Sequence, residues 1–407
     1  MKRRPILASW LFLSRLAILS ASAGLLSGSD HKTDHWVGTW ASSPQLAASA
    51  DQPPSGFADT TLRQIVHVSI GGTRLRVRFS NAFGKTALTI VSAHVAKADA
   101  GGAIQPASDK SLTFDSGSAV TIPAGALIYS DALDFELAPV SDLAVTIYLR
   151  GAPEGITVHS GSRATSYFCA GNAVSAKVLP APETADHWYF LNGVDVPARD
   201  SSAVVVLGDS ITDGKNSTTN ANGRWPDELT RRLQANKATS NVGVLNEGIG
   251  GNRLLHDGLG PNALARLDRD VLTQTGARWL IVLEGVNDIG ACKEDCDLDS
   301  IASDIIGAYR QIIVRAHSQK IKVYGATITP FGRSFYASPG AERARQAVNQ
   351  WIRTSGQFDS VIDFDAATRD PNDLPNLSAA SDSGDHLHPN DSGYKTMAGS
   401  IDLKLFR

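Results

Sequence analysis

Residues 203–214 read Ala-Val-Val-Val-Leu-Gly-Asp-Ser-Ile-Thr-Asp-Gly, and the architecture of the C-terminal half can be worked out from them. The five consecutive apolar residues 203–207 are typical of a parallel strand that is covered on both faces. The polar turn that follows carries Ser210 at the carboxyl end of this strand. Such a strand and turn predict an α/β sheet with a polar group at its rim.

The alternation of strand, loop and helix continues to the C-terminus. Apolar residues between Ile301 and Ala316 are spaced four, four, three and four apart, as on one face of a helix. Alternating strands and helices predict a doubly wound, flavodoxin-like parallel sheet with right-handed crossovers. The further strand candidates are Val242–Leu245, Trp279–Leu283, Val323–Ile328 and Val361–Phe364.

From Thr61 to Val196 the pattern repeats every two residues instead. Alternation is clear in residues 66–70 and again in residues 75–79, with Gly71-Gly72 between them. Two such runs around a glycine pair predict a β-hairpin with one buried face. Many short strands without helical periods predict an antiparallel β-sandwich, jelly-roll-like in character.

Three arginines, Arg74, Arg76 and Arg78, alternate with the apolar residues of the second run. We interpret them as the solvated face of an edge hairpin, where charge discourages pairing with other strands. The alternative is a surface that binds sugar or an acidic partner.

The first 23 residues have the order of a secretory signal peptide. Residues 2–4 are basic, an apolar stretch follows, and Ala21-Ser-Ala23 provides a small-residue cleavage site. A membrane anchor is disfavoured because Arg15 splits the apolar run. We therefore expect export, to a secreted or periplasmic location, and no membrane span in the mature chain.

The remaining chain is expected to form two domains, a β-sandwich over residues 24–198 and the α/β domain over residues 199–407. Among the 407 residues, 38 lysines and arginines face 41 aspartates and glutamates, for a net charge of −3. This balance provides no field for nucleic acid or anionic lipid. Neither class of partner is expected, and the oligomeric state is left open.

The chain has three cysteines, too few for a disulfide scaffold and without a CxxC zinc pattern. Cys292 and Cys296 are close enough for a bridge, which an oxidising compartment favours over two free thiols. Cys169 is then unpaired and is expected to be buried. A cysteine nucleophile is the sharper alternative, but no histidine-rich context accompanies it.

Four short motifs fall at the ends of predicted strands or in the terminal loop. Gly208-Asp-Ser-Ile211 ends the first strand, and Asn246-Glu-Gly-Ile-Gly-Gly-Asn252 ends the second. Gly285-Val-Asn-Asp288 ends the third, and Asp385-His-Leu-His-Pro389 lies near the C-terminus. The carboxyl ends of parallel strands meet at one edge, so these motifs are expected to come together.

Together the four motifs hold the groups that acyl transfer requires. A serine hydroxyl needs a base to become nucleophilic, and an imidazole needs a carboxylate to fix its tautomer. Ser210, His388 and Asp385 fit these three roles. The oxyanion needs rigid donors, which we assign to the N–H groups of Ser210 and Gly251 and to the side-chain amide of Asn287.

These motifs resemble the four blocks of the SGNH (GDSL) hydrolase superfamily, and the resemblance covers residues 203–407. It implies Ser210 as nucleophile, His388 as base and Asp385 as its orienting acid. It also implies Gly251 as an oxyanion donor, with Gly250 as the less favoured register. The extended motifs look most like secreted two-domain acylhydrolases found with xylan-degrading enzymes. That branch implies acetyl or short-acyl esters, including esters on polysaccharide.

Other interpretations of the motifs are weaker. Position 212 is Thr, so the G-x-S-x-G turn of α/β-hydrolases is absent. Arg253 stands where a dinucleotide fingerprint needs its third glycine. His386 beside His388 lacks the further ligands of a metal site. We therefore expect no cofactor and no metal.

Two sets of neighbouring residues have open roles. The first set could hold the site by hydrogen bonds or simply cap helices: Asp209, Asp213, Glu284 and Asp288. The second set could line an acyl or sugar pocket, with core packing an equal alternative for the first of them: Trp225, Phe331, Phe335 and Tyr336.

The sequence thus predicts an exported serine esterase or carbohydrate deacetylase that acts on a small-molecule or polysaccharide ester. One alternative is a carbohydrate-binding or adhesion protein with a vestigial hydrolase domain. Another is an acyltransferase that uses the same three residues.

Overall fold

The structure is a computed structural model that describes residues 35–292 and 296–407. The predicted signal peptide, residues 1–23, lies outside the described residues. Within the two described ranges, no helix combines the length and the apolar character needed to cross a bilayer.

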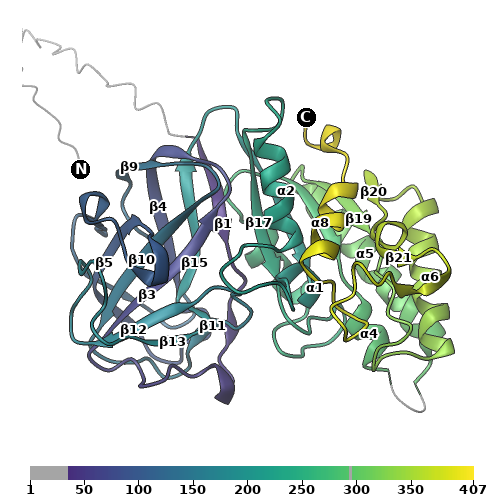
Figure 1. Cartoon of the computed structure of the whole chain (residues 1–407), viewed down its shortest axis with the longest axis horizontal. Coiled ribbons are helices and arrows are strands. Elements are labelled where there is room, and N and C mark those ends of the chain that lie inside the picture. Colours follow the sequence, from purple (N-terminus) through teal and green to yellow (C-terminus); the bar gives the residue numbers. More distant parts are fainter. Residues whose placement is uncertain (1–34, 293–295) are drawn as a thin grey trace, which may run out of the picture. The chain divides into compact units, whose positions relative to one another are not determined.

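The C-terminal half is built on a five-stranded sheet in which every neighbouring pair of strands is parallel (Figure 1). The order is β17-β16-β18-β19-β20, so the predicted parallel sheet is confirmed. Val204, Val205 and Val206 are all fully buried, although successive side chains point to opposite faces. Both faces of the sheet are therefore covered. The strands are β16 (Ser202–Gly208), β17 (Val242–Gly248), β18 (Ala277–Leu283), β19 (Lys322–Ala326) and β20 (Ser360–Ile362).

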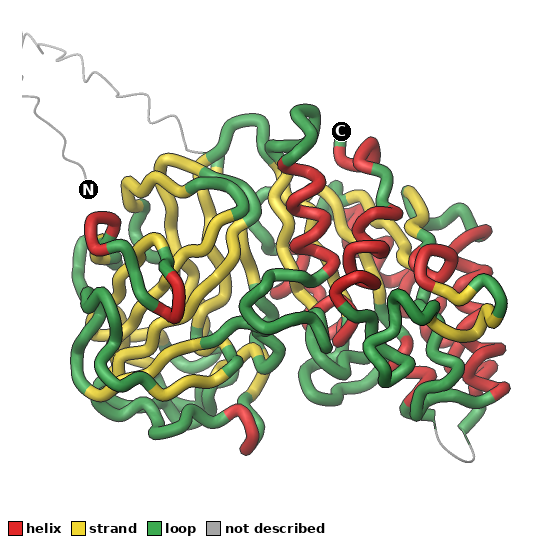
Figure 2. The backbone as a smooth tube through the Cα atoms, viewed as in Figure 1, coloured by secondary structure: helices red, strands yellow, loops and turns green. Residues whose placement is uncertain are grey.

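Helices alternate with these strands, as the sequence periods indicate. Figure 2 shows that the long helices lie in this half, whereas the other half is mostly strand and loop. α2 packs against β17 and α8, and α5 packs against β19 and α6. The helices are α1 (Ser210–Asp213), α2 (Trp225–Gln234), α3 (Ala263–Leu267), α4 (Val286–Gly290), α5 (Leu298–Ser318), α6 (Pro339–Thr354), α7 (Phe364–Thr368) and α8 (Asp391–Ser400). The short antiparallel pair β21 (Arg369–Asp370) and β22 (Asp373–Leu377) follows α7.

The N-terminal half consists of antiparallel sheets, in agreement with its two-residue period. One sheet has the order β1-β15-β4-β8 with β9 also on β4, and another has the order β13-β12-β3-β10-β5-β6 with β7 also on β5. A small sheet has the order β14-β11-β2. Strands of both halves belong to one continuous cluster of buried apolar residues. The division into separate domains stays a prediction.

The strands of this half are β1 (Trp36–Ala41), β2 (Gln45–Leu46), β3 (Thr60–Val68), β4 (Gly72–Ser80), β5 (Leu88–Lys97), β6 (Lys110–Ser111), β7 (Val120–Ile122), β8 (Leu127–Tyr129), β9 (Leu133–Leu137), β10 (Ser141–Leu149), β11 (Thr157–His159), β12 (Ser166–Ala170), β13 (Glu183–Ala185), β14 (Trp188–Tyr189) and β15 (Leu191–Pro197).

The predicted hairpin across Gly71-Gly72 is wrong. β3 pairs with β10 and β12, whereas β4 pairs with β15, β8 and β9 in a different sheet. A two-residue hairpin turn requires positive φ, and neither glycine has it. The pair instead allows close approach, since a Cβ on Gly71 would lie 2.5 Å from the carbonyl oxygen of Leu137. The chain crosses from one sheet to the other at this point.

The interpretation of the arginines as a solvated edge is also wrong, because β4 has neighbours on both sides. Arg76 contacts Asp195, with 2.9 Å between Nη2 and Oδ2, and lies over the ring of Trp36. Arg78 is 2% exposed and donates to Oε1 of Gln274 at 2.7 Å. Since Gln274 belongs to the C-terminal half, Arg78 joins the two halves.

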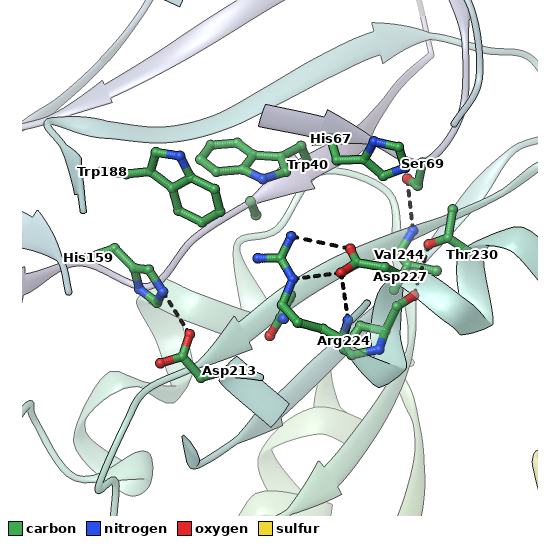
Figure 3. Close-up of a pocket in the computed structure, with 13 residues that line it drawn as sticks. Trp40, His67, Ser69, His159, Trp188, Asp213, Arg224, Asp227, Thr230 and Val244 are labelled. Atoms are coloured by element: carbon green, nitrogen blue, oxygen red, sulfur yellow. Dashed lines mark hydrogen bonds and ion pairs between the residues drawn. The ribbon is translucent and has the colours of Figure 1, made fainter. Parts of the chain in front are cut away.

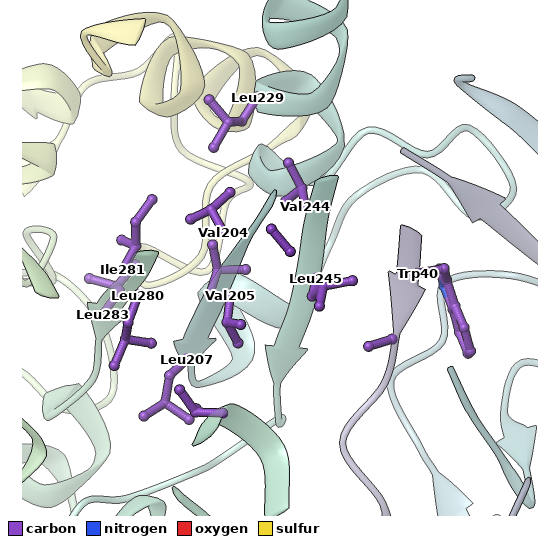
Figure 4. Close-up of a cluster of buried hydrophobic side chains, with 14 of the residues drawn as sticks. Trp40, Val204, Val205, Leu207, Leu229, Val244, Leu245, Leu280, Ile281 and Leu283 are labelled. Atoms are coloured by element: carbon purple, nitrogen blue, oxygen red, sulfur yellow. The ribbon is translucent and has the colours of Figure 1, made fainter. Parts of the chain in front are cut away.

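β1 covers the edge of the parallel sheet by packing against β17 (Figure 4). The backbone N–H of Gly38 donates to the carbonyl of Thr275, and that of Val244 donates to the hydroxyl of Ser69. Leu245 and Trp40 belong to the same buried cluster. An edge strand that would otherwise expose unpaired backbone groups is thereby covered.

Cysteine pairing follows the prediction. A disulfide joins Cys292 and Cys296, with 5.4 Å between the two Cα atoms. Cys169 is free and buried, and burial raises the pKa of its thiol. A thiol in this state is a poor nucleophile.

A buried arginine on α3 lies beneath the carboxyl ends of β16 and β17. Arg266 is 1% exposed. Its guanidinium donates to the carbonyls of Gly208 (3.1 Å) and Glu247 (2.6 Å), to Oδ1 of Asn252 (2.9 Å) and to Oγ of Ser43 (2.8 Å). Carbonyls from two strands, a side chain of the second motif and a residue of the N-terminal half thus share one donor group.

Two carboxylates lie next to the guanidinium of Arg266. Oδ2 of Asp270 is 3.2 Å from Nη1, and Oε1 of Glu284 is 3.5 Å from Nη2. A third buried acid, Glu247, accepts from Ser43 at 2.6 Å and from Gln274 at 2.8 Å. Burial is the main cause that raises the pKa of both Glu247 and Glu284. Arg266, together with Arg269 on Asp270, therefore offsets buried negative charge in this region.

We predict that Arg266→Met lowers the free energy of unfolding by about 3–5 kcal/mol, because it leaves Glu284 and several carbonyls buried without their donor. Arg231→Met, which removes a half-exposed pair with Glu228 on α2, is the control and should cost less than about 1 kcal/mol. Urea denaturation of the two variants measures both values. Equal losses would contradict the role given to Arg266.

Candidate active site

Ser210 is the first residue of α1, directly after β16. Asp209 precedes it as the N-cap, and its Oδ1 accepts the N–H of Ile211 at 2.9 Å. Ser210 is 9% exposed. The short turn from a buried strand into a capped helix therefore holds the hydroxyl at the carboxyl end of the sheet.

Ser210, His388 and Asp385 form a continuous chain of hydrogen bonds. The Oγ of Ser210 lies 2.8 Å from Nε2 of His388, and Nδ1 of His388 lies 2.7 Å from Oδ2 of Asp385. With the imidazole proton on Nδ1, facing the carboxylate, Nε2 is free to accept the proton of the serine hydroxyl. The loop before α8 supplies both His388 and Asp385.

The surroundings keep His388 neutral and Asp385 ionised. Burial lowers the pKa of His388, and hydrogen bonding and charge from Asp385 offset only part of this effect. Partial burial by itself would raise the pKa of Asp385. Hydrogen bonds from His388 and Leu387 outweigh it and hold that pKa well below its usual range. At neutral pH the pair is therefore a neutral imidazole beside a carboxylate.

The glycines of the second motif differ in what their N–H groups bind. The N–H of Gly250 donates to Oδ2 of Asp213 at 3.1 Å. The N–H groups of Ser210 and Gly251 donate to no acceptor within the described part of the chain. Gly251 lines the cavity beside Ser210. The N–H of Gly251, unlike that of Gly250, is therefore available to a further acceptor.

Asn287 is on α4, at the end of β18, and lines the same cavity. Its Nδ2 donates one hydrogen to the carbonyl of Asn252 at 2.8 Å, and its Oδ1 accepts from the hydroxyl of Tyr336 at 3.1 Å. An amide nitrogen has two hydrogens, so one remains for another acceptor. The partners on both sides hold the amide plane in place.

The cavity at the predicted site is walled by both halves of the chain. Its volume is about 420 Å³. Ser210, His388 and Asn287 line it from the C-terminal half. Gln45, Ser160 and Arg163 are among the residues that line it from the N-terminal half. A cavity of this size suits a small ester or the end of a larger one.

A histidine of the N-terminal half holds the turn of the second motif. His159, at the end of β11, is 4% exposed, and its Nε2 lies 2.9 Å from Oδ1 of Asp213 (Figure 3). Its Nδ1 lies 2.9 Å from the carbonyl of Ser43. The other oxygen of Asp213 accepts the N–H of Gly250. This chain connects an N-terminal strand to the residue that precedes Gly251.

The four acids with open roles act within the protein. Asp209 caps α1, and Asp288 accepts the N–H groups of Leu254 (2.9 Å) and Leu255 (3.0 Å). Asp213 and Glu284 bind His159 and Arg266 as described above. Burial raises the pKa of Asp209 and Asp288. These acids hold the turns of the site.

The aromatic candidates divide into two pairs. Phe335 and Tyr336 line the cavity, with 4.4 Å between their ring centroids. Trp225 is fully buried against Phe364, and Phe331 is 1% exposed. His386 pairs with Asp382 rather than with Ser210. No group of metal-binding side chains is found among residues 35–292 and 296–407.

Sequence reasoning missed the contribution of residues 157–163. The segment Thr-Val-His-Ser-Gly-Ser-Arg resembles an ordinary loop after a strand, and no spacing ties it to the C-terminal motifs. Gly161 shows how closely it approaches them, since a Cβ there would lie 1.8 Å from Oδ2 of Asp213. The only sequence signal for this close approach was Gly161, two residues after His159.

The parallel α/β sheet places a serine, a histidine and an aspartate together at its carboxyl edge. Residues 206–396 match the model of the GDSL-like Lipase/Acylhydrolase family. The chain therefore carries a domain of this family, within the SGNH superfamily that its four motifs resemble, and is a hydrolase. No curated protein gives a significant match to the chain.

Several solved structures are similar to about half of this chain. A GDSL-like lipase from Bacteroides thetaiotaomicron is 18% identical, with a TM-score of 0.37, and the match covers 50% of this chain and 88% of that one. A carbohydrate acetylesterase from Sinorhizobium meliloti is 14% identical, with a TM-score of 0.39 and coverages of 50% and 98%. An acetylxylan esterase from Geobacillus stearothermophilus is 19% identical, with a TM-score of 0.37 and coverages of 50% and 94%.

We predict that Gly161→Ala lowers kcat/KM for an aryl acetate by about tenfold or more, because the new Cβ displaces Asp213 and with it the turn at Gly250. Gly151→Ala is the matched control, since a Cβ there meets nothing within 4 Å. Steady-state kinetics and thermal unfolding of both variants separate loss of activity from loss of fold. Equal activity of the two variants would contradict the coupling.

Proposed function

We propose that this protein is a serine carboxylic-ester hydrolase for acetyl and other short-acyl esters, including esters on carbohydrate. The hydrogen-bonded chain from Ser210 through His388 to Asp385, at the edge of a cavity, carries the proposal. Membership of the GDSL-like lipase/acylhydrolase family supports the reaction class. The volume of the cavity supports a short acyl group.

In the first half of the reaction, Oγ of Ser210 attacks the ester carbonyl while its proton passes to Nε2 of His388. The lowered pKa of His388 keeps the imidazole in the accepting form at neutral pH. Asp385 holds Nδ1 and stabilises the imidazolium that forms. Nε2 then gives the proton to the departing alcohol, and an acyl-serine remains.

The negative charge of the tetrahedral intermediate falls on the former carbonyl oxygen. The donors for it are the N–H groups of Ser210 and Gly251 and the second hydrogen of Nδ2 in Asn287. Each donor of this kind lowers the barrier by roughly 3 kcal/mol. His159, Asp213 and Tyr336 are positioning residues, because they act through the hydrogen bonds that hold the donors.

In the second half, a water molecule takes the place of the alcohol. His388 removes its proton, the hydroxide oxygen attacks the acyl carbon, and the acyl–oxygen bond to Ser210 breaks. The proton on Nε2 returns to Oγ, which restores the starting state and releases the carboxylic acid.

The N-terminal sheets have a part in this function. We propose that they form a β-sandwich that completes the cavity through Gln45, Ser160 and Arg163 rather than a separate carbohydrate-binding module. The proposed export of the protein is supported by the pattern of residues 1–23 and by the disulfide between Cys292 and Cys296.

We predict that Ser210→Ala reduces kcat for 4-nitrophenyl acetate by at least about 10⁴-fold, because no other nucleophile takes its place. Labelling by a fluorophosphonate, followed by mass spectrometry, should modify wild type at this residue and leave the variant unmodified. Turnover by Ser210→Ala at the wild-type rate would refute the mechanism.

The pH profile tests the acid and the base. Because burial lowers the pKa of His388, kcat/KM should rise with pH to a midpoint below 6.5 and then level off. Asp385 raises this pKa, so Asp385→Asn should move the midpoint to still lower pH and reduce kcat by about 10²–10⁴-fold. Asp382→Asn, which alters the neighbouring His386 pair, is the control and should not move the midpoint. A midpoint that rises in Asp385→Asn would contradict the assignment.

A further inference from the structure

The cavity beside Ser210 has two ends of different chemistry. Arg163 and Lys215 line it together with His388. Both cations act on the imidazole through space and contribute to lowering the pKa of His388. Both cationic side chains therefore lie on the side of the cavity that holds His388.

The backbone of Arg163 is held in place, but its guanidinium has no charged partner among the described residues. Its backbone has a φ of 48°, in the left-handed region, and its carbonyl accepts the N–H of Asn220 at 2.9 Å. Its Nε is buried without a hydrogen-bond partner. Its guanidinium makes no hydrogen bond or ion pair with any of the described residues. A buried, unpaired guanidinium nitrogen is costly, so most such groups are found paired.

The acids at the cavity make hydrogen bonds to other groups, and among the described residues none of them forms an ion pair with Arg163 or Lys215. Asp213 accepts from His159 and from the N–H of Gly250. Asp51 accepts the N–H of Ala48 at 2.9 Å. Asp385, behind His388, binds that imidazole and the amide of Asn216.

Apolar side chains line the part of the cavity next to the oxyanion donors. Leu259 and Phe335 line it, with 71% and 75% of their surfaces exposed. Leu259 lies against Gly251, and Tyr336 contacts Asn287. Apolar side chains therefore lie next to the oxyanion donors, and cationic side chains lie on the side of His388.

In an ester hydrolase the base delivers its proton to the departing alcohol, so the alcohol portion of the substrate lies on the side of His388. We propose that Arg163 and Lys215 bind a carboxylate on this alcohol portion. The preferred substrates are then short-acyl esters of hydroxy acids or acidic sugars, with the acyl group at the apolar end. A planar guanidinium fork matches a planar carboxylate, and the lysine that lines the same cavity adds a second positive charge. The substrate preference rests on the proposed function, whereas the binding of the anion does not depend on it.

Two matched pairs of small molecules test the proposal. The products 3-hydroxybenzoate and 3-hydroxybenzamide have the same shape but differ in charge, and calorimetry on the full chain measures their binding without any turnover. The corresponding acetates, 3-acetoxybenzoate and 3-acetoxybenzamide, give the ratio of kcat/KM for the two leaving groups. At low salt we expect both ratios to favour the carboxylate by about tenfold.

Arg163→Gln should reduce both ratios to near unity, and Lys215→Gln should reduce them in part. Arg343→Gln, a substitution on the exposed face of α6 outside the cavity, is the matched control and should retain both ratios. Because Lys215 is exposed, its variant provides the test should Arg163→Gln fail to fold.

The outcomes separate the two proposals. Hydrolysis of both acetates without a preference, or a preference that survives in both cavity variants, overturns the anion site and leaves the esterase in place. Selective binding of 3-hydroxybenzoate that depends on Arg163, with neither acetate hydrolysed, supports the anion site and overturns the esterase.

Discussion

The burial of Arg266 is the constraint on which the rest of the structure depends. A guanidinium has five N–H donors and no acceptor, so in a dry interior it organises whatever carbonyls and carboxylates surround it. Here those groups are Gly208 and Glu247, at the ends of β16 and β17, and Asn252 of the second motif. Ser210 follows Gly208 by two residues, and Asn252 holds the amide of Asn287. One buried cation therefore sets the relative positions of three of the four motifs.

The same cluster explains why the N-terminal half is part of the site. Ser43 donates to Glu247 and accepts from Arg266, and the carbonyl of Ser43 faces His159. His159 then reaches Asp213, which holds Gly250. Buried polar networks are stable only when each member is satisfied, so the two halves are coupled by hydrogen bonding as well as by packing. Specificity can then change in the N-terminal loops without altering the groups at the ends of the parallel strands.

Sequence patterns predicted the parallel sheet well and the antiparallel one only in part. Apolar runs such as residues 203–207 have few alternatives, because a strand covered by helices on both faces must be apolar throughout. Alternation in β3 and β4 identified both as strands but not their partners. A glycine pair permits a tight turn and a close crossing equally, and only the position of Leu137 decides between them. Arg78 was misplaced for the same reason, since burial beside Gln274 depends on the other half of the chain.

By itself, the sequence determined the class of fold of the C-terminal half and singled out Ser210, His388 and Asp385, which the structure brings together. Strand ends of a parallel sheet share one edge, so residues that follow them must meet. Only the tertiary structure decided which glycine N–H is left without a partner, since the one at Gly250 is taken by Asp213. It also decided that Gln45, His159 and Arg163 belong to the cavity. Their contacts cross sequence separations of 50 residues or more, and local periodicity contains no information about such pairs.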